Sequence, residues 1–197
     1  MESLVLQPTA AAQWHSLVKE AESSSHCQLE EDLESYLVFL LMRFTSDKNI
    51  AARVLTLDYL YAMHEVGLHN RLRLVRDVGD LCLLHAGLFP LRAQRRRVSI
   101  SYFVGLGRSA YLHLAAHMPN SSADTYAHLG HGFVRLMGIL QAMRTLHGQP
   151  SLLNPLEAHE LWSDTGSHHA HQVACSTAQD PAKALLIKGQ VKPSRPH

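Results

Sequence analysis

The sequence predicts an all-α fold, a single-domain bundle of about six to seven helices followed by a disordered C-terminal tail. Apolar residues recur at intervals of three and four through most of the chain, which is typical of helices with one buried face. Strand-like alternation is almost absent, and Gly, Pro, Ser and Asn punctuate the apolar segments at short intervals. The 197 residues suffice for one domain with a sizeable core.

Four helices are predicted in the first half of the chain. The first covers residues 10–22 after Pro8-Thr9, and the second covers residues 29–44, where an acidic first turn favours a helix start. A third helix, capped by Ser46-Asp47, extends to Tyr61. The fourth covers residues 71–89 and ends before Pro90, because the residue before a proline is driven out of the helical region.

Three further helices are predicted in the second half. They are Val98 to His117, Ala123 to Leu146 after a turn at residues 119–122, and a short helix that follows Asn154-Pro155. After Trp162 the composition shifts to Ser, Thr, Gly, His and Ala. We therefore expect residues 1–162 to form the helical domain and residues 163–197 to be a low-complexity, disordered tail.

Charge and cysteine usage limit the classes of function. The formal net charge is +1, so the molecule as a whole has no field that would attract nucleic acid or a membrane. The three cysteines contain no CxxC pair, which argues against a disulfide framework and against a cysteine zinc site. The N-terminal residues do not resemble a signal peptide, and no apolar run is long enough to span a membrane. These features predict a cytoplasmic protein.

The segment from Gly79 to Tyr111, GDLCLLHAGLFPLRAQRRRVSISYFVGLGRSAY, is the most distinctive. Its residues suit helix packing: Gly79-Asp80 indicate a close helix contact, Gly87 a helix C-cap, and Phe89-Pro90 a corner. Small residues in the following helix would let a neighbouring backbone approach; they are Ser101, Gly105, Gly107 and Ala110.

The same segment resembles an uncharacterised bacterial all-helical family with the pattern GDxxLxxxGxFP…YFxxxGxxAY. The matching residues are Gly79, Asp80, Leu83, Gly87, Phe89, Pro90, Tyr102, Phe103, Gly107, Ala110 and Tyr111. The resemblance implies a helical fold and a bacterial source, and it carries no catalytic residues. GLGRS at residues 105–109 is not a dinucleotide-binding loop, because no strand precedes it.

A short basic cluster precedes the fifth predicted helix. Arg92, Arg95, Arg96 and Arg97 could contact phosphate oxygens, and the nearby Tyr102 and Phe103 could stack on bases. The alternative is a solvated loop whose charges pair with helix acids. The near-neutral charge of the chain favours the second interpretation.

Histidine is unusually frequent, with 15 residues in the chain. His113 and His117 are four apart on one predicted helix, and His128 and His131 are three apart on the next, with Asp124 between the pairs. If the two helices face each other, these five side chains predict a site for a divalent transition metal. The alternative is that they are surface histidines. His168, His169 and His171 in the predicted tail could bind metal weakly.

No catalytic residue stands out. Cys82 lies in an apolar run that is typical of a core, and Ser109 lacks a GxSxG motif. The sequence therefore favours a non-catalytic bacterial helical protein that binds another protein or itself. The alternatives are a metal- or cofactor-binding helical protein, which could be an enzyme, that uses the histidine hairpin, and a nucleic-acid binder that uses Arg92–Arg97.

Overall fold

The computed structural model describes residues 9–46, 67–90, 98–146 and 151–178. Within these residues the chain forms helices and no strand, so the predicted all-α class is confirmed. The helices are α1 (Ala10–Ser25), α2 (Glu31–Ser46), α4 (Leu68–Gly87), α6 (Ile100–His117), α7 (Asn120–Thr145), α8 (Pro155–Thr165) and α9 (His168–Ala178). The helix predicted from Ser46-Asp47 to Tyr61 lies almost wholly outside the described residues.

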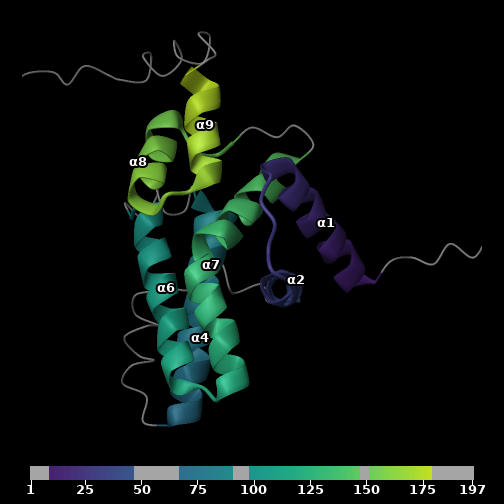
Figure 1. Ribbon diagram of the computed structural model, residues 1–197, viewed down its shortest axis with the longest axis vertical. Coiled ribbons are helices and arrows are strands. Elements are labelled where there is room, and N and C mark those ends of the chain that lie inside the picture. The colour runs from purple at the N-terminus through teal and green to yellow at the C-terminus, as the bar shows by residue number, and fades with distance from the viewer. Residues whose placement is uncertain (1–8, 47–66, 91–97, 147–150, 179–197) are drawn as a thin grey trace, which may run out of the picture.

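Three long helices, α4, α6 and α7, lie side by side and form the body of the molecule (Figure 1). α1 and α2 pack on the flank of α7, and α2 runs across the direction of the three long helices (Figure 1). α8 and α9 form a hairpin over one end of the bundle (Figure 1). Residues 78–87 of α4 are all buried, because α6 and α7 both pack against this helix. None of the helices in the described ranges has both the length and the apolar character that crossing a membrane requires.

The helix ends follow from local sequence. Thr9 caps α1 and Ser99 caps α6, each with a side-chain oxygen that accepts a backbone N–H of the first turn. Asn154 and Glu157 form a reciprocal capping box at the start of α8. Gly166 ends that helix in the left-handed region, with φ of 70°. The turn predicted at residues 119–122 is wrong, since α7 already begins at Asn120.

The predicted C-terminal boundary after Trp162 is also wrong. α8 continues to Thr165, and α9 extends the ordered helices to Ala178. α9 has few large apolar residues, but its Ala170 is fully buried and the helix packs against α8 and α7. A small buried residue gives almost no periodic signal in the sequence, which explains the error. The rest of the predicted tail, residues 179–197, lies outside the described residues.

Gly87 has a different role from the predicted helix cap. Leu88, in the ordinary helical region, is the C-cap of α4. A Cβ on Gly87 would lie 2.4 Å from the Cβ of Leu140 on α7. The glycine therefore lets α4 and α7 approach each other closely, and any larger residue there would push them apart.

Candidate functional site

The most buried charged group in the described residues lies in the segment that the sequence singled out. Asp80 on α4 is only 2% exposed. Its Oδ1 accepts hydrogen bonds from the hydroxyls of Tyr36 on α2, at 2.6 Å, and Tyr111 on α6, at 2.7 Å. Its Oδ2 is paired with the guanidinium of Arg43 on α2. One carboxylate thus connects three helices.

The surroundings of Asp80 explain the protonation of its partners. Burial is the main cause that raises the pKa of Tyr36 and of Tyr111 well above the usual value, and the negative charge of Asp80 adds to it. Both hydroxyls therefore stay protonated and act as hydrogen-bond donors. Burial also raises the pKa of Asp80, against the effect of the Arg43 charge. Both carboxylate oxygens are occupied by contacts within the chain, which is typical of a structural network.

The neighbouring motif residues pack around this network. A Cβ on Gly79 would lie 2.7 Å from the ring of Tyr111, and Gly107 lies against Phe133 in the same way. The Phe103 ring stacks on His85, which also makes an edge-to-face contact with Phe89. Pro90 is buried at the corner, and Tyr102 is exposed on the outer side of α6. The contacts that the structure shows for these motif residues are those of helix packing.

The predicted metal site on the histidine hairpin is not assembled. His113 and His117 stack on each other, with ring centroids 4.2 Å apart, and His117 Nδ1 is hydrogen-bonded to the backbone carbonyl of His113. His128 turns away from them to Asp32 on α2, with Nδ1 2.7 Å from Oδ2. Asp124 and His131 are exposed. Among the residues that the structure describes, no group of three or more His, Cys, Asp or Glu side chains could hold a metal ion.

The reason lies in the orientation of helix faces. The sequence correctly placed the two histidine pairs on consecutive helices, and α6 does pack against α7. However, α7 also packs against α2, and His128 lies on that side of the helix. Helical spacing tells which residues share a face, but not which neighbour the face meets.

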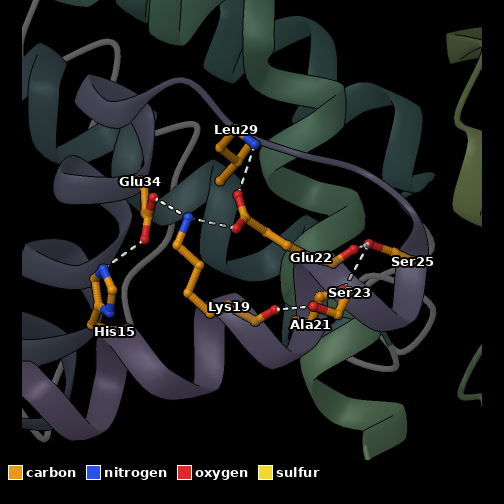
Figure 2. A network of polar contacts seen from close by, with 8 residues as sticks. All are labelled: His15, Lys19, Ala21, Glu22, Ser23, Ser25, Leu29 and Glu34. Carbon is orange, nitrogen blue, oxygen red and sulfur yellow. Dashed lines mark hydrogen bonds and ion pairs between the residues drawn. The ribbon is translucent and has the colours of Figure 1, made fainter.

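The acidic start of α2 does more than favour helix formation. Asp32 pairs with His128, and Glu30, just before the helix, forms a two-pronged contact with Arg135 of α7 at 3.0–3.1 Å. Figure 2 shows the third contact, in which Lys19 of α1 lies between Glu22 and Glu34, with Nζ–O distances of 3.0 and 2.6 Å. These contacts therefore fasten α2 to α1 and to α7.

The pair of His128 and Asp32 predicts a pH dependence. The hydrogen bond that His128 donates to Asp32 raises the pKa of His128 above 6.5. Partial burial alone would raise the pKa of Asp32, but the hydrogen bond with His128 holds it below 3.8. The pair therefore stabilises the fold fully between pH 3.8 and 6.5. The contribution is lost as the pH rises through the pKa of His128, or falls through that of Asp32.

An NMR titration of the histidine rings checks this expectation. We expect His128 to titrate above 6.5, and to return to about that value in Asp32→Asn. His113, whose pKa is lowered by burial, is the control, and its pKa should be the same in both proteins. A His128 titration that Asp32→Asn leaves unchanged would show that the pair does not form in solution.

The predicted anion site at Arg92, Arg95, Arg96 and Arg97 lies outside the described residues. Another surface carries a cluster of aromatic, histidine and cysteine side chains, and its α9 part lies in the predicted tail. Trp162 of α8 contacts the rings of His159 and His171, with centroids 5.5 and 4.7 Å away. His171 Nε2 in turn lies 3.5 Å from Cys175 Sγ. We call the exposed side formed by Leu156, His159, Trp162, His171 and Cys175 the hairpin face.

The hairpin face exposes large apolar groups. Leu156 is 65% exposed and Trp162 is 39% exposed. Residues 155–178 contain no Lys or Arg. The capping signal Asn154-Pro155 was recognised in the sequence, but the spacing of His168, His171 and Cys175 by three and four residues was not, although it predicts a second helix with these side chains on one face.

A pocket lies between the end of α1, the middle of α7 and the turn that joins α8 to α9. It encloses about 420 Å³, part of it open to solvent, and its wall includes Cys27, Arg135, His168 and His169. Burial raises the pKa of the Cys27 thiol and lowers that of the His169 imidazole. Both groups are thereby held neutral, which does not suit a cysteine nucleophile.

Comparisons with known proteins found no matching family model, no matching curated protein and no matching solved structure. The resemblance of residues 79–111 to an uncharacterised bacterial family therefore stays a prediction.

Proposed function

We propose that this chain is a non-catalytic helical module that associates with a second copy of itself through the hairpin face. The observation that carries the proposal is the exposure of two large apolar side chains of α8, Leu156 and Trp162, on the hairpin face. Large apolar groups at a surface mark sites of interaction, and tryptophan is enriched among the residues that dominate binding energy.

The symmetry of a dimer supports a second copy as the partner. A two-fold axis through the face would place α8 of one copy against α9 of the other, so that each copy covers the exposed Trp162 of its partner. Residues 155–178 contain no Lys, which fits the depletion of lysine at interfaces.

The proposal includes a location in the bacterial cytoplasm. Cys27, Cys82 and Cys175 are all free thiols, which suits a reducing compartment. The alternative of nucleic-acid binding rests on Arg92–Arg97, and no contact among the described residues adds to it.

Analytical ultracentrifugation over a range of concentrations tests the association. We expect a reversible dimer whose dissociation constant rises at least about tenfold in Leu156→Glu, which corresponds to a loss of about 1.4 kcal/mol or more. Leu68→Glu is the matched control, because Leu68 is 52% exposed and begins α4 at the end of the bundle away from α8 and α9. A wild type that stays monomeric, or equal effects of the two variants, would contradict the proposal.

A further inference from the structure

α9 places a thiol and an imidazole one helical turn apart on its exposed side. His171 and Cys175 are four residues apart, and the contact between them joins the two atoms that bind metals best, Nε2 and Sγ, at 3.5 Å. Cys175 is exposed, so the pair is accessible from solvent.

The spacing of these two atoms is that of neighbouring ligands on a tetrahedral zinc ion. Zinc binds sulfur at about 2.3 Å and imidazole nitrogen at about 2.0–2.1 Å. At the tetrahedral angle of about 109°, those two bond lengths place the donor atoms roughly 3.5 Å apart. The observed 3.5 Å therefore lets one zinc ion bind both atoms without a change of helix geometry.

The His171 ring is also held in place. It packs against the indole of Trp162, with centroids 4.7 Å apart and an angle of 51° between the rings. Trp162 is in turn in contact with His159. A ligand whose ring is fixed by its neighbours loses less freedom when it binds a metal, so the pair is partly preorganised.

Two ligands make only half of a closed zinc site. Structural zinc sites have four protein ligands, and no third His, Cys, Asp or Glu among the described residues joins the pair in a group that could hold a metal. The pair lies on the hairpin face, where we have placed the contact with a second copy. A two-fold axis there would supply an identical pair and complete a His₂Cys₂ set.

From these observations we infer that His171 and Cys175 form half of a zinc site that two copies of the chain complete at the hairpin face. The inference rests on the proposed self-association and adds the metal that joins the copies. Each Cys175 thiol releases its proton to the solvent when it binds, and no oxidation is involved. The ligands come from one helix of each of two chains, so no CxxC pair in the sequence indicates the site.

The test uses the full chain, reduced and freed of metal, to which Zn²⁺ alone is added. We expect one zinc ion for two chains, and a dimer that a chelator reverses. Co²⁺ in place of Zn²⁺ should give the visible absorption of a tetrahedral thiolate site. Cys175→Ser and His171→Gln should each weaken zinc binding by at least about tenfold, and both should keep the thermal unfolding transition, which shows that they fold.

Two matched controls separate this site from general metal binding. Cys27→Ser removes another free thiol, and His117→Gln removes one member of another i,i+4 pair, His113 and His117. Both variants should bind zinc as the wild type does.

The outcomes distinguish the inference from the proposed function. A dimer that forms equally with zinc and with chelator would overturn the zinc site but support self-association. A zinc-loaded monomer would overturn completion by a second copy and self-association together. Zinc binding that survives in Cys175→Ser would overturn the assignment of the ligands, and so would the absence of any zinc binding.

Discussion

Replacing Asp80 by alanine is expected to lower the free energy of unfolding by about 3–5 kcal/mol. The substitution leaves the hydroxyls of Tyr36 and Tyr111 buried without their acceptor, and it removes the partner of the Arg43 guanidinium. Removing one member of a buried charged network lowers the free energy of unfolding by more than the intact network adds to it. The reason is that the remaining polar groups stay buried without partners. Urea denaturation followed by circular dichroism measures the change.

Asp77 is the matched control for this prediction. It lies one helical turn before Asp80 and is also near Arg43, but it is half-buried and its carboxylate is 3.8 Å from the guanidinium. Asp77→Ala should therefore cost at most about 1 kcal/mol. If Asp80→Ala costs no more than Asp77→Ala, the network does not hold α2 against α4 and α6.

Tyrosine variants measure how much of the free energy lost in Asp80→Ala comes from each of the two hydroxyl contacts. Tyr36→Phe and Tyr111→Phe each keep the ring and remove one hydrogen bond to a charged acceptor, which should cost about 1.5–3 kcal/mol. In the Asp80→Ala background the same changes should cost less, because the acceptor has already gone. Strictly additive effects would indicate that the hydroxyls do not depend on Asp80.

Gly107→Leu is expected to destabilise the fold by about 3 kcal/mol or more, through overpacking. Already a Cβ at this position would lie 2.4 Å from the ring of Phe133 and 2.9 Å from the Cβ of Cys82. Cys82 belongs to α4 and Phe133 to α7, so the added group meets both helices that enclose α6. The backbone of α6 would have to move outward.

Gly105→Leu provides the comparison within the same helix. A Cβ at Gly105 meets no atom within 4 Å, so the change should be neutral, or stabilising by up to about 1 kcal/mol through helix propensity. Thermal unfolding of both variants measures the difference. Similar melting temperatures for the two would show that the close approach at Gly107 is absent in solution.

Most helix positions could be predicted from the sequence, because they depend on short-range patterns. α1, α2, α4, α6 and α7 each have apolar residues that recur at helical spacing, and the Asn154-Pro155 signal predicts the start of α8. Cys82 was correctly assigned to the core for the same reason. α9 was missed, because its buried contact is through the small Ala170.

The candidate sites depended far more on tertiary structure. The sequence placed Asp80 at a close helix contact, yet its partners Tyr36 and Arg43 come from a helix about forty residues earlier, as the hydrogen bonds to Asp80 show. For the same reason helical spacing did not show that His128 contacts Asp32 and not His113. Nor did it show the contact between His171 and Cys175, which lies in a segment whose composition predicts a tail.

The amino-acid sequence by itself determined that this chain is helical and where most of its helices begin and end, since capping and periodicity act over a few residues. Only the tertiary structure decided that Gly107 and not Gly105 is enclosed, that His128 meets Asp32, and that Leu156 and Trp162 stay exposed. The physical reason is that a helix fixes which side chains share a face, whereas the packing of all the helices together decides what each face meets.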